Sequence, residues 1–358
     1  MKFEQLISLF QETHKELQAK AAHSVDIALV VRNWLFGWYI VEYEQRGEDR
    51  AKYGSYLIDE LSKELTVKGT SPTNLRKFRE FYQAYPDIQQ TVSVRSIYSE
   101  KGDVFSYASI RQTVSTELAK RFSLGWSHHV VLMTLDNLKE RHFYEIESIQ
   151  NSWSVRELKR QIASSLYERL ALSRDSEKVK ELSEKGLVVE SVSDIVKSPY
   201  VLEFLDLEEH SVYSENDLET AIINKLEHFL LELGKGFLFE ARQKRFTFDD
   251  DHFYVDLVFY NRLLRCYVLI DLKRDKLTHQ DLGQMQMYVN YFDRYVKTED
   301  ESPTIGIVLC HRKNDALVEL TLPDKANIFA SKYLLYLPSK DELKKQVEEA
   351  LSNVGKEK

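Results

Sequence analysis

The sequence predicts a two-domain α+β protein, with an all-helical N-terminal half followed by an α/β domain. At 358 residues, the chain is longer than one typical hydrophobic core accommodates. Residues 1–170 follow the hydrophobic period of helices, whereas residues 237–273 follow the strand period of two. A charged, weakly periodic stretch separates the two patterns. We therefore expect a helical domain at 1–172, a linker at 173–198 and an α/β domain at 199–350.

The composition indicates folded domains and a net acidic chain. A hydrophobic fraction of 43% is enough for packed domains. The formal net charge is -8, and residues 201–358 carry the acidic excess. An acidic total argues against nonspecific coating of nucleic acid, although it permits a local basic surface. Much of the excess lies in one acidic run without Lys or Arg: Glu203, Asp206, Glu208, Glu209, Glu215, Asp217 and Glu219.

Cysteines and apolar segments point to a cytoplasmic protein. Cys266 and Cys310 lie in apolar, strand-like runs without zinc-ligand spacing, so we expect two reduced, buried thiols. Residues 27–43 are the most apolar segment, but Arg32 and Asn33 interrupt it before about 18 apolar residues accumulate. We expect this segment to be a buried helix and not a membrane span. The N-terminus, amphipathic and mixed in charge, is unlike a signal peptide.

The first candidate helix-turn-helix unit lies near residues 57–82. Ser71 followed by Pro72 is a helix start signal, because serine caps the free amides and proline fits the first helical position. Arg76 and Arg79 lie mostly off the apolar stripe of this second helix. They are candidate DNA contacts, since basic residues at the start of a second helix suit DNA binding.

The second candidate unit spans roughly residues 139–170. Ser154 and Glu157 have the spacing of a capping box, in which each side chain satisfies the other's free backbone amide. An antiparallel helix pair with a solvated face has the same pattern as either unit, so this alternative stays open. The residues of this helix expected to be exposed and to contact DNA are Arg156, Lys159 and Arg160.

The pattern of the second half predicts, in order, a helix, three strands, a helix and a strand. A short strand and a polar C-terminal helix are expected to follow. The expected bounds are a helix at 215–233, strands at 237–248, 252–261 and 265–273, a helix at 279–294, strands at 304–311 and 332–337, and a helix from Lys340.

Two of these strands carry the strongest chemical signal. Asp271 and Lys273 are two residues apart, so they point to the same face of their strand. A hairpin could bring Asp256 of the preceding strand beside them. Two carboxylates with the Leu272 carbonyl offer hard oxygen ligands to Mg²⁺, and Lys273 could stabilise charge on a phosphodiester. Taken alone, an Asp-x-Lys at a strand end is common in any protein.

Five other positions could complete this site or contact the DNA beside it. Glu219 lies at the edge of an apolar helical stripe, where a metal could neutralise it; the alternative is a glutamate that reaches solvent. Gln243 and the adjacent Arg242 lie among basic residues in a strand and could meet the site or the DNA backbone. Gln284 and Tyr288 share a helix face. They could orient substrate or lysine, or form a half-buried face with satisfied polar tips.

These motifs resemble the PD-(D/E)xK nuclease superfamily through Asp256, Asp271-Leu-Lys273 and the element order, and Gln284-x-x-x-Tyr288 resembles an element of its RecB-like members. Longer strings are similar to the YhcG-type nucleases of bacteria and cover nearly the whole chain. They lie at residues 74–82, 124–128, 153–158, 198–205, 231–237, 242–245 and 282–285.

The resemblance implies a restriction-endonuclease-like second domain that hydrolyses DNA with Mg²⁺ (or Mn²⁺). Its metal ligands would be Asp256, Asp271, Leu272 and Glu219. It also implies a role beside restriction-modification or defence complexes, and a homodimer if both strands are cut. Asp271 departs from the glutamate usual in many members and is one methylene shorter, which could shift the metal.

Two alternatives stay open. A nuclease-fold adaptor could dock onto another complex without cutting, and the acidic run favours this hypothesis modestly. The same run could instead cover the DNA face until a partner arrives. The intact set of Asp256, Asp271 and Lys273 counts against a pure adaptor. A ribonuclease would share the chemistry and differ only in substrate.

Overall fold

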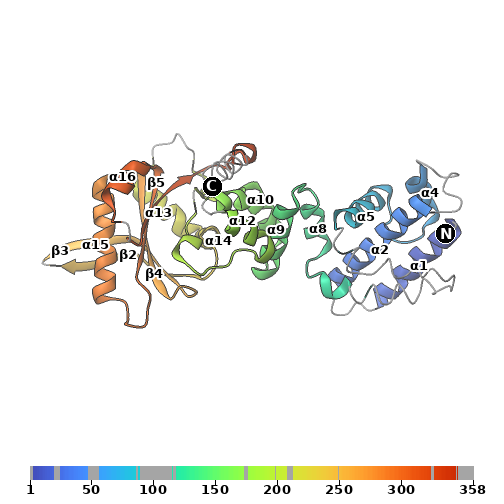
Figure 1. Cartoon of the computed structure of the whole chain (residues 1–358), viewed down its shortest axis with the longest axis horizontal. Helices are drawn as coiled ribbons and strands as arrows, with labels where there is room; N and C mark the ends of the chain where they lie inside the picture. The colour runs from blue at the N-terminus through green and yellow to red at the C-terminus, as the bar shows by residue number, and fades with distance from the viewer. Residues whose placement is uncertain are drawn as a thin grey trace. The chain divides into compact units, whose positions relative to one another are not determined.

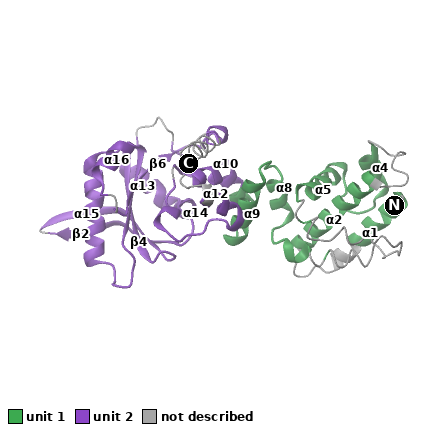
Figure 2. Cartoon of the chain, in the orientation of Figure 1, with its two compact units in different colours: residues 1–158 green, residues 159–358 purple. Residues whose placement is uncertain are grey.

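The computed structural model describes residues 3–19, 25–46, 56–85, 88, 115, 118–172, 176–197, 199–207, 213–248, 250–323, 326–343 and 345. The chain divides into two compact units, residues 1–158 and 159–358 (Figure 2). The described part of the first unit is helical, and the second unit contains the sheet (Figure 1). This confirms the predicted fold class.

The first unit is built from helices of seven to 22 residues, which pack around an aromatic core. No strand occurs in its described residues. The helices are α1 (Phe3–Ala19), α2 (Val25–Arg46), α4 (Leu57–Glu64), α5 (Pro72–Ala84), α8 (Trp126–Leu132), α9 (Leu138–Gln150) and the start of α10 (Val155–Ala163).

Helix α2 contains the apolar segment 27–43 and is the centre of this core. Its Trp34 and Phe36 are fully buried, as predicted for a core helix. At Gly37 the backbones of α2 and α5 come so close that an added Cβ would lie 2.0 Å from the Phe78 carbonyl oxygen. Only glycine permits this approach in the middle of an apolar helix. Among the described helices, none is both long and apolar enough to cross a membrane.

Both predicted helix starts are present. Pro72 opens α5, and the Ser71 side chain accepts a hydrogen bond from the Asn74 amide at 3.4 Å. The Ser154 hydroxyl accepts one from the Glu157 amide at 3.1 Å at the start of α10. These caps fix where the helices begin, while the DNA-binding role of the two helix pairs stays a prediction.

The second unit has the predicted order of helix, three strands, helix and strand, with the first helix divided in two. Further short elements come before and after it. The elements are α11 (Leu166–Leu172), α12 (Ser176–Lys185), η3 (Val192–Asp194), β1 (Tyr200–Val201), η4 (Glu203–Leu205), α13 (Glu215–Asn224), α14 (Leu226–Leu233), β2 (Phe237–Phe248), β3 (Asp251–Asn261), β4 (Cys266–Lys276), α15 (His279–Tyr295), β5 (Ile305–Arg312), α16 (Asp315–Thr321) and β6 (Ile328–Leu334).

A six-stranded sheet in the order β1-β6-β5-β4-β3-β2 forms the middle layer. Strands β2, β3 and β4 pair antiparallel, and the remaining pairs are parallel. Helices α13 and α14 pack on the face that carries Leu257 and Ile270. Helices α15 and α16 cover the other face, where Val258 and Leu269 lie. Cys266 and Cys310 are free and buried within this sheet, as predicted.

Three predicted bounds differ from the structure. The helix expected at 215–233 is divided at Lys225, whose amide bonds to the carbonyls of the preceding turn and ends α13. The strand expected at 332–337 runs from Ile328 to Leu334, because its pairing with β5 begins at Ile328. The C-terminal helix is present at 340–343, and most of its predicted length lies outside the described residues.

A buried ionic cluster ties the region before the sheet into the second unit. The fully buried Glu232 carboxylate accepts hydrogen bonds from Arg169 Nη1 at 2.6 Å and from the Val201 amide at 3.0 Å. Arg160 Nη2 lies 3.5 Å from the same carboxylate, and the Lys197 ammonium donates to the Glu232 carbonyl. These cations lie in the second compact unit, which begins at residue 159, earlier than the expected boundary at 172.

The Glu232→Gln substitution tests this cluster. Burial alone would raise the pKa of Glu232, but Arg169, Lys197 and Arg160 outweigh it and lower the pKa to about 2. A depressed pKa stabilises the fold above the ordinary value of 4.5, and this contribution is lost as pH falls through about 2. We expect the glutamine variant to lose about 3 kcal/mol of unfolding free energy at neutral pH. In urea unfolding, the difference from the parent should shrink toward pH 2.

Glu203→Gln is the matched control, because Glu203 also pairs with Arg160 but its side chain is 19% exposed. Its effect should be the smaller one at neutral pH. An equal effect of both variants, or a Glu232 effect that does not change with pH, would contradict the prediction.

Candidate active site

The predicted acids and lysine meet where β3 and β4 separate. Pairing between these strands ends at Leu257 and Ile270. Just beyond this pair, the Asp256 carboxylate accepts a hydrogen bond from the Leu272 amide at 2.9 Å. The side chain thus replaces a main-chain acceptor of the neighbouring strand. In the gap between the strands, Asp256 and Asp271 therefore lie close together, and the Leu272 amide still has a hydrogen-bond acceptor.

Lys273 is the cation of this cluster. Its ammonium lies 2.8 Å from Asp271 Oδ2 and 3.7 Å from Glu215 Oε2. Asp271 Oδ2 is buried, and Lys273 lies close enough to form a charge-assisted contact with it. The Asp271 side chain is 3% exposed and that of Lys273 is 17% exposed. The arrangement agrees with the alternation along β4 that placed both side chains on one face.

The electrostatics of the cluster favour a protonated acid in the absence of further cations. Burial, with the nearby Asp256 adding to it, raises the pKa of Asp271 to about 7, although Lys273 opposes the shift. Burial also raises the pKa of Asp256. Burial alone would lower the pKa of Lys273, but Asp271 and Glu215 outweigh it and the pKa lies above its ordinary range. One ammonium therefore does not neutralise this group of carboxylates.

Helix α13 and strand β2 extend the site on the other side of Asp256. The Gln243 amide donates to Asp256 Oδ1 at 3.0 Å and also to Glu219 Oε2. The Arg242 guanidinium pairs with Glu219 Oε1 and donates to the Thr220 hydroxyl at 3.1 Å. Glu219 is only 2% exposed, so the alternative of a glutamate that reaches solvent is wrong. Glu219, Gln243 and Asp256 form one connected hydrogen-bonded chain.

The backbone of Gln243 is unusual for a strand. Its φ is +47°, in the left-handed region, although it lies in the middle of β2. The register pairs Arg242 with Leu257 and Lys244 with Val255, and the residue between is not paired. This conformation costs a non-glycine residue about 1–2 kcal/mol. Its hydrogen bonds to two site acids give the distortion a role in the geometry of the site.

Gln284 and Tyr288 of α15 border the same cluster. The Gln284 amide donates to the Tyr288 hydroxyl, and the Tyr288 side chain is buried. Burial raises the pKa of Tyr288, the bond from Gln284 opposes this, and Asp271 and Asp256 add to it. The hydroxyl is therefore within electrostatic reach of both acids. Whether it contacts substrate stays a prediction.

Glu215 is a site residue that sequence reasoning missed. Its carboxylate faces Lys273 and accepts a hydrogen bond from the Arg274 amide at 3.3 Å. It precedes Glu219 by four residues, so both lie on one side of α13. That spacing is the signal that could have identified it. It was instead counted only as a member of the acidic run.

The described acids of the acidic run are distributed over separate contacts. Glu203 accepts a hydrogen bond from Arg160 at 2.7 Å, and Asp206 lies 3.9 Å from Lys225. Asp217 completes a capping box with Ser214 at the start of α13. Glu215 and Glu219 belong to the site described above. Glu208 and Glu209 lie outside the described residues.

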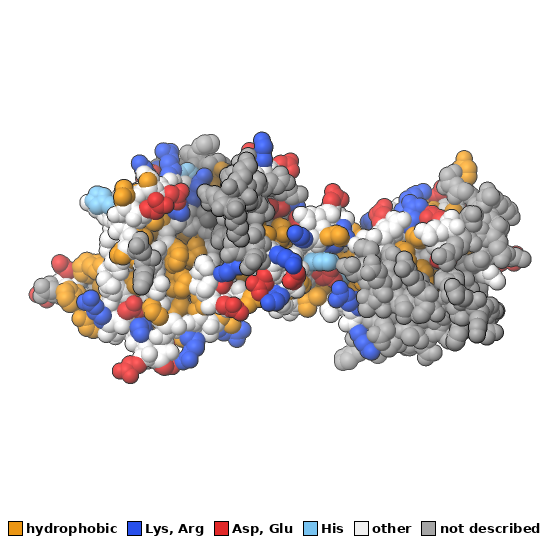
Figure 3. All heavy atoms as spheres, viewed as in Figure 1, with side chains coloured by type: hydrophobic (Ala, Val, Ile, Leu, Met, Phe, Trp, Pro, Cys, Tyr) orange, Lys and Arg blue, Asp and Glu red, His pale blue; other side chains and the backbone are white. Residues whose placement is uncertain are grey.

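The predicted DNA contacts differ in accessibility. The expected exposure of Arg160 is wrong, because its side chain is 13% exposed and pairs with Glu203. Arg76 pairs with Asp59 at 3.1 Å and Arg79 pairs with Glu44 at 2.9 Å, both near the surface. Arg156 and Lys159 are exposed on α10. On the face of the second unit drawn in Figure 3, acidic and basic side chains are interspersed.

The donor set fits a hard divalent cation. Carboxylate oxygens are the ligands that Mg²⁺ and Mn²⁺ prefer, and Asp271 offers a buried carboxylate beside Lys273. Each Asp256 oxygen has one donor, which leaves further lone pairs free for a metal. In the described part of the chain, no three His, Cys, Asp or Glu residues converge as a preformed metal cage. Mg²⁺ does not require one, because it keeps several waters.

Comparisons with known proteins agree with these observations. Residues 193–348 match the family model "YhcG PDDEXK nuclease domain", and residues 10–169 match "DUF1016 N-terminal domain". The Escherichia coli (strain K12) protein "Putative nuclease YhcG" is 40% identical over 336 residues, which cover 91% of this chain and 88% of that protein.

Two solved structures show weaker likeness. They are a "crystal structure of a repair endonuclease from Pyrococcus abyssi" (19% identical) and a "Structure of EndoMS-dsDNA2 complex" (17% identical). Each match covers 37% of this chain and half of the other, with a TM-score of 0.25. No inference rests on these two structures.

The strain at position 243 can be measured. We expect Gln243→Gly to be about 1 kcal/mol more stable than Gln243→Ala, because both remove the amide and only glycine relieves the left-handed backbone. Urea unfolding of the two variants measures the difference. Lys244→Gly and Lys244→Ala are the control pair, since the Lys244 φ is not positive, and there alanine should be the more stable. Equal stabilities at position 243 would contradict the strain.

Proposed function

The chain belongs to the YhcG family of PDDEXK nucleases, and from this we propose that its second unit hydrolyses phosphodiester bonds of DNA with bound Mg²⁺ or Mn²⁺. The observation that carries the proposal is the meeting of Asp256, Asp271 and Lys273 at the gap between β3 and β4. A buried group with more acids than cations is poised to bind a divalent cation.

Each residue has a role that follows from its contacts. Asp256 and Asp271, with the Leu272 carbonyl and Glu219, would hold the cation. A bound divalent cation polarises the scissile phosphate and acidifies a water molecule. Lys273, positioned by Asp271, would stabilise negative charge on the phosphate or orient the attacking water.

Four side chains would act from the rim of the site. Gln243 positions Asp256 and Glu219 through its amide. Gln284 and Tyr288 would orient the substrate phosphate or the lysine from α15. Arg242, whose side chain is 37% exposed, can serve the DNA backbone when Glu219 turns to the metal.

The adaptor hypothesis was favoured by the acidic run and by the net negative charge of the second half. The described acids of the run are ion-paired, cap a helix or belong to the site, which weakens the first of these two grounds. Cleavage of RNA would use the same residues, so the substrate assay has to include it. A restriction-modification or defence complex as partner, and a homodimer, are the further expectations from family resemblance.

The first test is cleavage of supercoiled plasmid by purified protein with Mg²⁺, with Mn²⁺ and with EDTA. We expect metal-dependent cutting that Lys273→Ala reduces by about 100-fold or more, because a preorganised charge at the phosphate is lost. Lys276→Ala is the matched control: this lysine is on the same strand but exposed, and its loss should change little. A linear product would agree with a dimer, whose presence sedimentation then checks.

The same assay separates the alternatives. Cutting that survives in Lys273→Ala would contradict the assignment of the site. A faster cut of single-stranded RNA than of DNA would favour the ribonuclease hypothesis. The absence of cutting, together with the absence of metal binding, would favour the adaptor.

Metal binding itself is predicted to stabilise the fold. With Mg²⁺ or Mn²⁺ at ten times its Kd, the gain is about 1.4 kcal/mol of unfolding free energy, visible as a rise in Tm. We expect Asp256→Asn and Asp271→Asn each to abolish this rise. Asp300→Asn is the control, since Asp300 is an exposed acid paired with Arg265. A rise that persists in both site variants would place the metal elsewhere.

A further inference from the structure

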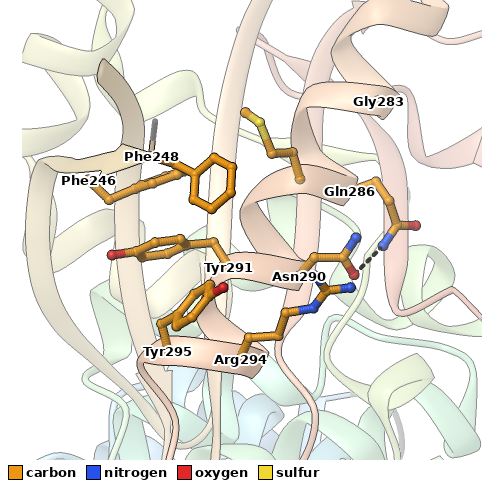
Figure 4. Close-up of a pocket in the computed structure, with 9 residues that line it drawn as sticks. Phe246, Phe248, Gly283, Gln286, Asn290, Tyr291, Arg294 and Tyr295 are labelled. Atoms are coloured by element: carbon orange, nitrogen blue, oxygen red, sulfur yellow. Dashed lines mark hydrogen bonds between the residues drawn. The ribbon is translucent and has the colours of Figure 1, made fainter. Parts of the chain in front are cut away.

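A groove of about 350 Å³ lies between the end of β2 and the outer side of α15 (Figure 4). One wall is aromatic, with rings from both β2 and α15, and the polar part of the lining comes from α15. The lining residues are Phe246, Phe248, Gly283, Gln286, Met287, Asn290, Tyr291, Arg294 and Tyr295. None of them belongs to the candidate active site.

The aromatic wall is an ordered stack that ends in solvent. Phe246 and Tyr291 stack with ring centres 4.0 Å apart and planes 18° from parallel. Tyr295 continues the row, 5.3 Å from Tyr291. Tyr295 is 63% exposed and Phe248 is 58% exposed. Two large aromatic residues thus offer their surfaces at the groove, and hydrophobic side chains are visible around the β2–β3 hairpin in Figure 3.

The helix side of the groove carries hydrogen-bonding groups and one positive charge. The Gln286 amide donates to Asn290 Oδ1 at 3.2 Å, and Figure 4 shows the exposed Arg294 guanidinium on the same side. No Asp or Glu is among the lining residues, in a chain with a net charge of -8. A ligand with an aromatic face, a hydrogen-bonding edge and a negative charge complements these three features.

The groove adjoins the candidate active site through Tyr288. Phe246 of the aromatic wall contacts Tyr288 edge to face, with ring centres 5.6 Å apart. The Tyr288 hydroxyl accepts a hydrogen bond from Gln284 and lies within electrostatic reach of Asp271. Phe246 and Tyr288 therefore connect the groove to the cluster of acids.

We propose that this groove binds an unpaired nucleobase of the DNA substrate, stacked on Phe248 and Tyr295 with its phosphate near Arg294. The proposal rests on the proposed nuclease function and names its substrate class: DNA with displaced or unpaired nucleotides next to the cut. Aromatic stacking recognises any base, whereas the bases of an intact duplex already stack on one another and are not available.

The test is binding of labelled DNA in EDTA, so that no cutting occurs. One probe is a duplex with a central unpaired bubble, and the other is the same sequence fully paired. We expect Phe248→Ala combined with Tyr295→Ala to weaken bubble binding by about tenfold and to leave duplex binding within about twofold. Tyr254→Ala is the control, because Tyr254 is an aromatic residue 45% exposed outside the groove. Both truncated side chains are exposed, and an unchanged Tm confirms that the variant is folded.

Other outcomes overturn the inference. Equal loss on both probes, or no loss, would remove the base-binding role. A change in sedimentation of the double variant without a selective loss would identify the groove as a contact between copies of the chain. Tighter binding of a bubble with RNA strands would overturn the assignment to DNA.

The Lys273→Ala variant separates this inference from the proposed nuclease activity. The variant should lose cutting and keep the parent's preference for the bubble, because Lys273 lies outside the groove. A parent protein that prefers the bubble through Phe248 and Tyr295 but never cuts would refute the nuclease alone. A parent that cuts DNA but shows no dependence on these residues would refute the groove alone.

Discussion

The close approach of the buried Asp271 and the half-buried Asp256 is the constraint on which the rest of the site depends. Two carboxylates in a poorly hydrated gap repel one another, and one lysine does not balance them. The fold tolerates the pair because β3 and β4 have separated there and the Leu272 amide bonds to one of the acids. Gln243 then joins Asp256 to Glu219 at the expense of a left-handed backbone.

A comparison of Glu232 with Asp271, both buried acids of the second unit, shows what distinguishes scaffold from site. Glu232 is surrounded by Arg169, Arg160 and Lys197, and its pKa falls to about 2. Asp271 is equally buried but has one cation and a second acid nearby, and its pKa rises to about 7. The first cluster is electrostatically complete and holds segments together. The second lacks positive charge, which an added divalent cation would supply.

The sequence was sufficient for what depends on local period and spacing. Alternation predicted the sheet order around β3 and β4, and the two-residue spacing of Asp271 and Lys273 predicted their shared face. The sequence was insufficient where a partner far away along the chain decides whether a side chain is exposed. Arg160 has the sequence features of a solvated arginine, yet Glu203 lies 43 positions away and pairs with it. The position of Glu219 was ambiguous for the same reason, because Arg242 and Gln243 reach it from a strand that local patterns do not place.

The distortion of β2 also affects how the sheet ends. β2 is the last strand of the sheet, so one of its sides has no neighbouring strand. A long, regular edge of this kind is a template for another chain and promotes aggregation. Here a bulge between Phe239 and Ala241 and the left-handed Gln243 interrupt the repeat of amides and carbonyls, and basic side chains such as Lys244 add charge. The irregularity that shapes the site therefore also makes this edge a poorer template for a strand of another chain.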